Sequence, residues 1–279
     1  MLIKCWGARG SIPVSGREYD KYGGSTTCLE IRSKNDDIII VDAGSGIRKL
    51  GVTLLKEGKK DINILFTHAH WDHLLGFPFF KPIYFKGTKI KMYGCPFAQE
   101  SVRHMIAPSM AAPYFPIAFD NVAADITGHD ICREPFSIGP ITIHPILLSH
   151  PNQGIGYRFE EDGKSFVFLT DNELSFKHEG GLDYKEYLEF SAGADLLVHD
   201  AEYSEDEYKI TRMWGHSTYK DALNLALDAG VMTFGLFHHN QERSDEALDN
   251  IVEECKRVVL EKDSFLDCFA MYEGQEINL

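Results

Sequence analysis

The residues best suited to chemistry in this chain lie in one short run that contains His68, His70, Asp72 and His73. His68 and His70 are two positions apart, so in an extended backbone their side chains point the same way and can share a metal ion. Asp72 and His73 come next, near the start of a brief predicted helix, and can face a second ion. Because these ligands are imidazoles and a carboxylate with no thiolate, the run suits Zn²⁺ and equally Fe or Mn.

Further His and Asp residues directly follow apolar runs that predict strands. They are His150, Asp171 and the adjacent pair His238 and His239. Side chains at the ends of neighbouring strands can converge at one edge of a sheet, where α/β proteins commonly bind ligands. Together with the histidine-rich run, they predict a metal site assembled from distant parts of the chain.

The elements that must position these residues are predicted from hydrophobic spacing. Proline-rich residues 95–135 predict a long loop with one helix at 99–106. Helical spacing predicts helices at 218–229, with Ser217 as the N-cap, and at 245–260. The interleaving of these helices with strands favours a layered α/β sandwich of mixed sheets. The predicted strands are 2–5, 28–32, 38–42, 62–66, 141–147, 156–160, 166–170, 196–198 and 233–237.

Size and charge limit the classes of function. The 279 residues allow one large α/β domain or two modest ones. The formal net charge of -14 argues against a general nucleic-acid binder or a protein of anionic membranes, because such proteins usually present a basic face. Two dications in a cleft would nevertheless reverse the local field. Nucleic acid is therefore not the expected partner.

Cysteine usage and the N-terminus predict the compartment. The 6 cysteines are scattered and form no C-x-x-C pair, so buried free thiols are expected rather than a disulfide framework. The N-terminus has no basic stretch followed by an apolar run, and no apolar run approaches the roughly 20 residues of a membrane helix. These features predict a cytoplasmic protein without membrane contacts.

The order of these residues resembles that of the metallo-β-lactamase superfamily. The resemblance rests on the turn at 42–46, the run at 67–73, His150, the Thr170-Asp171 pair and the His238-His239 pair. It implies one domain, 1–279, with a four-layer αββα sandwich and two mixed β-sheets. It also implies two divalent metal ions, with zinc as the first choice and manganese or iron as alternatives.

The same resemblance implies how the ligands are shared. His68, His70 and His150 would bind one ion, and Asp171 would bridge to the other. The second ion would be bound by Asp72, His73 and His238. His238 is favoured over His239 because the family's last ligand directly follows a strand, although the sequence leaves that choice open. Asp42 is expected to orient one of the ligand histidines by accepting its hydrogen bond.

Two further stretches resemble one branch of the superfamily, the tRNA 3′-processing endonucleases. Residues 199–203 are similar to that branch's His-Glu-Ala-Thr element, and residues 215–218 to its Gly-His-Ser-Thr element. The resemblance implies that Asp200 and His216 act together in proton transfer to the leaving group, and Asp72 is counted with them as catalytic. The aspartate at 200 is one methylene shorter than the glutamate of those nucleases.

These features favour a metal-dependent hydrolase of a small phosphodiester, with cyclic nucleotides among the candidates, cleaved by a hydroxide bound to both ions. The bacterial tRNA enzymes carry a long arm between the third histidine and the bridging aspartate, whereas His150 and Asp171 lie only 21 positions apart here.

The alternatives are a thioester or lactone hydrolase on the same site, a nuclease acting on RNA or DNA, and a metal-bearing protein without activity. Relatives in this branch also make a homodimer a candidate assembly.

Several other residues are given expected roles. Tyr114 and Phe115 are interpreted as loop-packing residues, with stacking on a substrate as the alternative, and the acidic run 202–207 as a solvated helix start. Arg9, in a glycine-rich loop, is a candidate phosphate contact, and His199 is balanced between a core role and a site role. Structural positions are expected for His104, His129, His144 and His178.

Overall fold

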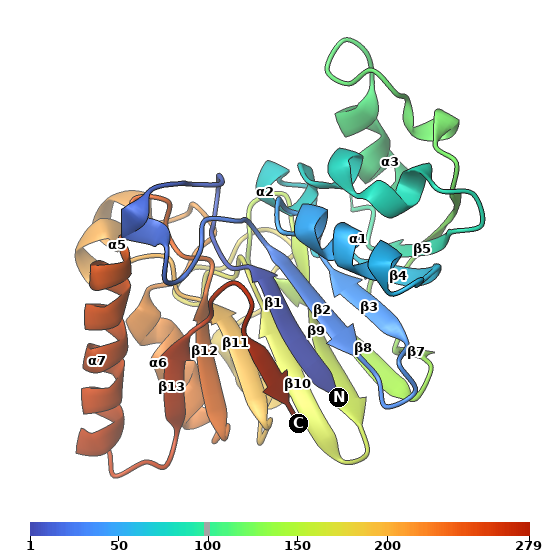
Figure 1. Ribbon diagram of the computed structural model, residues 1–279. Coiled ribbons are helices and arrows are strands. Elements are labelled where there is room, and N and C mark those ends of the chain that lie inside the picture. Colours follow the sequence, from blue (N-terminus) through green and yellow to red (C-terminus); the bar gives the residue numbers. More distant parts are fainter. Residues whose placement is uncertain (98–100) are drawn as a thin grey trace.

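Two β-sheets of seven strands each pack face to face, and helices cover their outer sides (Figure 1). The computed structural model describes residues 1–97 and 101–279. Both sheets contain parallel and antiparallel pairs. This is the α/β sandwich with two mixed sheets that the sequence predicted.

The first sheet contains the N-terminal half of the chain and one C-terminal strand. Strands β3 to β6 run parallel, whereas β14, β1, β2 and β3 pair antiparallel. Because β1 pairs with β14, the two ends of the chain lie side by side (Figure 1). In order across the sheet the strands are β14 (Glu276–Asn278), β1 (Leu2–Gly7), β2 (Cys28–Arg32), β3 (Ile38–Val41), β4 (Asp61–Leu65), β5 (Lys89–Gly94) and β6 (Asp125–Asp130).

The second sheet is formed by the C-terminal half of the chain. Strands β10 to β13 run parallel, and β7 to β10 pair antiparallel. The pairing makes β8, β10, β11 and β12 all run in one direction, so their C-terminal ends lie at the same edge. In order across the sheet the strands are β13 (Asp267–Ala270), β12 (Thr233–Phe237), β11 (Leu196–Asp200), β10 (Lys164–Leu169), β9 (Gly154–Glu161), β8 (Ile141–Leu148) and β7 (Phe136–Ile138).

The helices agree in part with the sequence prediction. Helices α6 (Tyr219–Asp228) and α7 (Asp245–Glu261) confirm the two predicted by apolar spacing. The N-cap of α6 is Thr218, whose hydroxyl accepts a hydrogen bond from Asp221 N, so the prediction of Ser217 was wrong. No helix within the described residues is long and apolar enough to cross a membrane. The other α-helices of the sandwich are α1 (Ile47–Lys56), α2 (Trp71–Leu74), α4 (Tyr184–Ser191) and α5 (Glu205–Thr211).

Three buried clusters hold the layers together. The central cluster lies between the sheets and joins Ile3 and Ile31 of the first sheet to Phe159 and Phe168 of the second. One outer cluster packs α1 against the first sheet, and the other packs α6 and α7 against the second. Strand β11 is buried along its whole length because both faces of its sheet are covered. The loops at the strand ends are therefore carried by a rigid frame.

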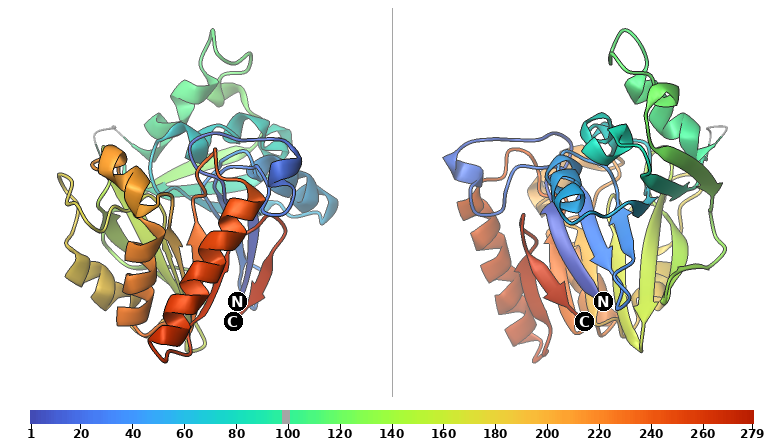
Figure 2. Two further views of the ribbon diagram at one scale, coloured as in Figure 1. Left: turned by 90° about the vertical axis from the view of Figure 1, so that its left-hand side faces the viewer. Right: turned by 45° about the vertical axis from the view of Figure 1, so that its right-hand side comes forward.

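Between β5 and β6 the chain leaves the sandwich and forms a projecting lobe, described over residues 101–124 (Figures 1 and 2). It contains α3 (Val102–Ile106) and two short 3₁₀ helices, Ala107–Met110 and Phe119–Asn121. The predicted helix at 99–106 begins on residues outside the described ranges, and its described part coincides with α3. The prediction of a long loop over 95–135 was wrong at its end, because β6 continues the first sheet there.

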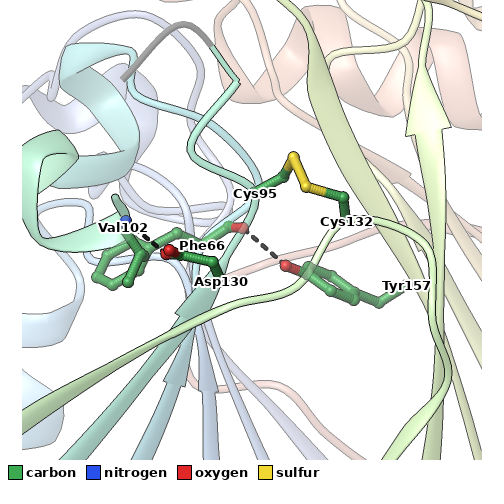
Figure 3. The surroundings of a disulfide bond; sticks show 6 residues. All are labelled: Phe66, Cys95, Val102, Asp130, Cys132 and Tyr157. Carbon is green, nitrogen blue, oxygen red and sulfur yellow. Dashed lines mark hydrogen bonds between the residues drawn. A yellow bond between two sulfur atoms is a disulfide. The ribbon is translucent and has the colours of Figure 1, made fainter. Parts of the chain in front are cut away.

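A disulfide between Cys95 and Cys132 joins the two chain segments at the base of the lobe (Figure 3). Beside it, Val102 N donates to Asp130 Oδ1 at 2.9 Å, which ties the start of α3 to β6. The prediction of free thiols was wrong for this pair, because 37 residues separate the two cysteines and no local spacing reveals the bond. The prediction is confirmed for the buried free thiols Cys5, Cys28, Cys255 and Cys268.

Candidate metal centre

The residues predicted as metal ligands meet at one end of the sandwich. The histidine-rich run follows β4, and His150, Asp171 and His238 lie just beyond the ends of β8, β10 and β12. These three strands end at the same edge of the second sheet, so residues far apart in sequence are brought together. Two groups of potential ligand atoms contain these residues, each with all its atoms within 4.8 Å of one another, and a third such group adjoins them at Asp200, Glu202, His216 and His238.

The first cluster consists of His68, His70, His150 and Asp171. His70 Nδ1 and His150 Nε2 are 3.0 Å apart. The Oδ1 atom of Asp171 lies 3.6 Å from His68 Nε2 and 3.9 Å from His150 Nε2. Three imidazole nitrogens and one carboxylate oxygen therefore point at a common centre.

The second cluster consists of Asp72, His73, Asp171 and His238, all of them buried. Asp72 Oδ2 lies 3.0 Å from His238 Nε2 and 3.3 Å from His73 Nε2. Asp171 Oδ2 is 3.2 Å from His73 Nε2, and its Oδ1 is 3.3 Å from His238 Nε2. Asp171 thus belongs to both clusters, which is the position that a bridging carboxylate requires.

The adjacent histidines 238 and 239 have different surroundings. His238 lies in the second cluster, whereas His239 Nε2 donates to the carbonyl oxygen of Met271 at 2.8 Å. The ring of His239 also packs edge-on against Tyr22. The geometry therefore separates the two residues that the sequence left open, and favours His238 as the ligand.

Three residues of the site have positive φ angles although none is glycine. They are Asp42 at 63°, Asp171 at 52° and His238 at 58°. The left-handed region is uncommon for residues with a Cβ atom, and such strain concentrates at functional sites. Each of the three directly follows a strand or lies two residues beyond one, so the strain turns the side chain toward the clusters.

Asp42 contacts a proposed ligand, as the sequence predicted. Its Oδ2 atom accepts from His73 Nδ1 at 2.7 Å and from Thr67 Oγ1 at 2.7 Å, and its Oδ1 accepts from Thr67 N at 2.8 Å. Complete burial raises the pKa of the Asp42 carboxyl, although His73 and Thr67 act in the opposite direction. The carboxylate fixes the proton of His73 on Nδ1 and leaves Nε2 directed at the second cluster.

Glu202 plays the equivalent part for His238, and the sequence did not predict it. Its Oε2 atom accepts from His238 Nδ1 at 2.9 Å, and its Oε1 accepts from Asn240 Nδ2 at 2.9 Å. The interpretation of residues 202–207 as a solvated acidic run is wrong at this position, because Glu202 is buried. The only sequence signal was its place two residues after Asp200, since side chains two positions apart in an extended chain point the same way.

His216 and Asp200 form the predicted pair. His216 Nδ1 donates to Asp200 Oδ2 at 2.8 Å, and the same nitrogen lies 3.9 Å from Asp171 Oδ1. The His216 ring stacks on that of His238 with centroids 4.7 Å apart. Burial alone would lower the pKa of His216, but the carboxylates of Glu202 and Asp200 outweigh it and raise that pKa to about 9. The two carboxylates therefore favour the protonated form of this imidazole, which lies beside both clusters.

A second buried glutamate, Glu173, holds the loop that carries His216. Its carboxylate accepts from Met213 N and Gly215 N, each at 2.8 Å. Gly215 O in turn accepts from His150 Nδ1 at 2.9 Å. No sequence pattern marked Glu173, because the backbone groups that it holds, Met213 N and Gly215 N, are about 40 residues away. It positions a loop that serves both His216 and the first cluster.

Two other expectations can be compared with the structure. Arg9 is wholly buried and donates to three backbone carbonyl oxygens, those of Gly23, Asn240 and Arg243. The prediction that Arg9 contacts a phosphate was therefore wrong, because its guanidinium is used to hold two loops together. His178 has a structural contact, as predicted, since its Nε2 donates to Glu173 Oε2 at 2.7 Å.

The residues of the two clusters fit a pair of divalent ions. The Nε2 atoms of His68 and His73 are buried and make no hydrogen bond within the described part of the chain. A buried polar atom without a partner is costly, so such atoms need an explanation. Each of these nitrogens faces carboxylate oxygens 3.2–3.6 Å away. Imidazoles and carboxylates without thiolates match the ligand preferences of zinc, manganese and iron.

Known proteins share this arrangement of the chain. The family described as "Beta-lactamase superfamily domain" matches residues 38–239, which include every residue of both clusters. A ribonuclease Z of Haloarcula marismortui is 24% identical, covering 92% of this chain and 91% of its own. The metallo-β-lactamase fold protein YhfI from Bacillus subtilis has a TM-score of 0.73 at 18% identity, covering 99% of this chain and 98% of its own. A diphosphatase from the PhnP family has a TM-score of 0.69 at 18% identity, covering 100% and 97%.

Proposed function

We propose that this chain, which belongs to the β-lactamase superfamily, is a metal-dependent hydrolase that cleaves phosphodiester bonds. One ion is assigned to His68, His70 and His150, and Asp171 lies between it and the second. The second ion is assigned to Asp72, His73 and His238. Zinc is the first choice for both, with manganese and iron as alternatives.

The observation that carries this proposal is the hydrogen-bonded pair of His216 and Asp200 beside the shared Asp171. A proton donor next to a metal centre is needed when the leaving group is an alkoxide, as it is in a phosphodiester. Asp200 engages His216 Nδ1, and Nε2 makes no hydrogen bond within the described residues. Nε2 is therefore the atom that can deliver a proton to the leaving oxygen.

When bound, the two ions would activate water near neutral pH and offset the charge that develops on the phosphate. Residues of the chain orient the carboxylate of Asp72. Asp72 Oδ2 accepts from Ser11 N at 2.9 Å, which orients this proposed catalytic carboxylate, and His238 Nε2 lies 3.0 Å from the same oxygen. Proton donation by His216 would contribute roughly 10²–10⁴ to the rate.

For the substrate, the relatives favour RNA over the small phosphodiester ranked first from the sequence. Ribonuclease Z is the name of the Haloarcula relative, which aligns over almost the whole chain. A small phosphodiester stays the second candidate on one observation: only a turn and two strands join His150 to Asp171, which leaves no arm to hold a folded RNA. Cytoplasmic location and a homodimer also stay predictions.

A substrate panel tests the proposal. Protein of known metal content is assayed with bis(p-nitrophenyl) phosphate, an RNA with a 3′ extension, cyclic AMP, a thioester and a lactone. We expect phosphodiester turnover that His216→Ala lowers by roughly 10²–10⁴ while both ions are retained. The matched control is His144→Ala, a half-exposed histidine on β8 that pairs with Glu160 and has no contact with the site.

The outcomes separate the alternatives. Turnover of the thioester or lactone without phosphodiester turnover would replace the proposed reaction while keeping the metal centre. Loss of metal from His216→Ala to the same degree as loss of turnover would refute the assignment of His216 as a proton donor. Cleavage of the RNA but not of cyclic AMP would place RNA ahead of the small substrate.

A further inference from the structure

Beside the histidine-rich run lies a pocket of about 370 Å³, between α2 and the lobe. Ala69, Trp71 and Leu74 line one side, and Pro108 and Tyr114 line the other. No lining residue carries a formal charge, so the pocket contrasts with the carboxylates and imidazoles of the two clusters. Its volume falls within the range of small-molecule sites, roughly 300–1,000 Å³.

Two large aromatic side chains of this pocket are open to solvent. Trp71 is 72% exposed and Tyr114 is 80% exposed, although side chains of this size usually bury most of their surface. The interpretation of Tyr114 as a loop-packing residue was therefore wrong. Phe115 does pack, edge-on against Phe79 with ring centroids 5.6 Å apart. Exposed aromatic faces in an apolar hollow are suited to stacking on planar rings such as nucleobases.

The position of Trp71 in the chain ties the pocket to the metal centre. Trp71 stands between His70 and Asp72, which are assigned to different ions. Its Cα atom is therefore ~3.8 Å from the Cα of a proposed ligand on either side. Ala69 also lines the pocket and stands between His68 and His70, so two lining residues alternate along the chain with proposed ligands.

The opposite wall of the pocket is anchored rather than loose. Val102, Ile106 and Met110 of the lobe are fully buried in the same cluster as strands β4 and β5 of the first sheet. The disulfide at Cys95 and Cys132 closes the base of the lobe (Figure 3). Tyr114 is therefore presented from a fixed backbone, which lowers the entropy lost when a ring binds.

We propose that this pocket binds a planar aromatic ring of the substrate, a nucleobase next to the phosphodiester being cleaved. The inference rests on the proposed function, and it names the substrate class as a nucleotide ester rather than an aliphatic one. Trp71 and Tyr114 supply the ring faces. Because the pocket has no charged group, it contributes to substrate affinity and to the choice of substrate. Proton transfer is assigned to His216 alone.

Binding of product-like probes tests the pocket without requiring turnover. Metal-loaded protein is titrated calorimetrically with adenosine 5′-monophosphate and with ribose 5-phosphate, which differ only in the base. We expect the nucleotide to bind about tenfold or more tightly, since stacking of one base on an aromatic side chain has effects of this size. Trp71→Ala and Tyr114→Ala should reduce that ratio severalfold while changing ribose 5-phosphate binding less than twofold.

The controls distinguish this pocket from the metal centre. Phe265→Ala removes an aromatic side chain that is 98% exposed elsewhere, and it should leave the ratio unchanged. Trp71→Phe keeps a ring and should restore most of the preference. Equal binding of the two probes by the unmodified protein, or an unchanged ratio in both alanine variants, would overturn the pocket alone. Absence of bis(p-nitrophenyl) phosphate turnover would instead overturn the proposed function.

Discussion

The two ligand clusters differ in what stands behind their histidines. In the second cluster each histidine is backed by a buried carboxylate. His73 Nδ1 donates to Asp42 at 2.7 Å, and His238 Nδ1 donates to Glu202 at 2.9 Å. Each carboxylate also accepts a hydrogen bond from a second donor, which is Thr67 Oγ1 for Asp42 and Asn240 Nδ2 for Glu202.

In the first cluster the histidines are backed by neutral groups. His68 Nδ1 lies 3.1 Å from the hydroxyl oxygen of Thr67, and His150 Nδ1 donates to the carbonyl oxygen of Gly215 at 2.9 Å. His70 uses Nδ1 toward the cluster itself, 3.0 Å from His150 Nε2, and is only half-buried.

This difference predicts unequal metal affinity. A carboxylate behind a histidine increases the basicity of the ligand nitrogen and fixes its tautomer. The second cluster also contains Asp72, whereas the first has only its share of Asp171. We therefore expect two steps in a chelator titration, with the ion of the first cluster leaving before that of the second.

The largest effect is expected from the residue that the clusters share. Asp171→Ala removes one ligand from each ion, so metal content should fall from two ions to fewer than one. Phosphodiester turnover should fall by about 10³, which corresponds to ~4 kcal/mol of transition-state stabilisation. Metal analysis and steady-state kinetics measure the two quantities. Asp162→Ala, an exposed aspartate paired with Lys34, is the control and should change neither.

Substitution of Asp42 tests the carboxylate side of the comparison. In Asp42→Asn, an amide that keeps its oxygen on Thr67 N presents its NH₂ to His73 Nδ1. The ring must then carry its proton on Nε2, the atom that faces the second cluster. We expect the affinity for one ion to fall about 10–100-fold, seen as a shift of the later chelator step.

Glu202→Gln is the corresponding substitution behind His238, and its expected effect on metal affinity is smaller. The glutamine can keep its oxygen on His238 Nδ1, and only the contact with Asn240 has to rearrange. We therefore expect a shift of a fewfold in the same step. If both variants shifted the earlier step instead, carboxylate backing would not be what separates the two clusters.

A buried pair near the clusters, His199 and Asn172, predicts a pH dependence of stability. His199 Nδ1 donates to Asp200 O, and its Nε2 accepts from Asn172 Nδ2, so both ring nitrogens are used in the neutral form. Asn172 cannot flip without cost, because its Oδ1 accepts from Ser149 N. Burial therefore lowers the pKa of His199 to about 4.

The sign follows from linkage. Between the unfolded pKa of about 6.5 and the folded value, the unfolded chain binds a proton that the folded chain does not. The free energy of unfolding should therefore fall as pH falls, by ~2 kcal/mol from this group between pH 7 and pH 5. Urea unfolding of protein kept in chelator measures it. His199→Gln should show a shallower pH dependence than the unmodified protein or His144→Gln, and an equal one would contradict the locked neutral ring.

Much of the site was predictable because its signal is local. The run at 68–73 combines metal-binding residue types at a spacing that two ions require, and His150, Asp171 and His238 each follow a strongly apolar strand. Asp42 was also predicted, because the turn at 42–46 after a strand resembles one in the family. The sandwich fold was predicted from the same apolar runs. Long periodic segments such as α7 are predictable because their apolar residues recur on the one face that is buried.

The remainder depends on contacts that have no local pattern. Glu202 was taken for part of an exposed acidic run, and only the fold, which places it two residues beyond β11, brings it to His238. The bond between Cys95 and Cys132 joins positions 37 residues apart with no motif. Strand β6 was missed because its residues are mostly exposed and polar, so no alternation marks it. In each case the tertiary neighbour, rather than the sequence nearby, decides the role.

Glu173 contacts neither cluster directly, and its substitution tests the neutral side of the comparison. Each carboxylate oxygen accepts from two donors: Oε1 from Met213 N and Tyr208 Oη, and Oε2 from Gly215 N and His178 Nε2. In Glu173→Gln one end becomes an NH₂ group facing two donors, so two hydrogen bonds are lost whichever way the amide turns.

The loop that carries His216 and Gly215 O should then shift. We expect turnover to fall about tenfold and the earlier chelator step to weaken, because Gly215 O backs His150 in the first cluster. The later step should stay in place, since the Glu173 carboxylate makes no hydrogen bond to Asp42 or Glu202 among the described residues. Glu205→Gln, an exposed glutamate at the start of α5, is the matched control. A general loss of structure would weaken both chelator steps together, so a shift of the earlier step alone is the result that identifies Glu173 as a positioning residue.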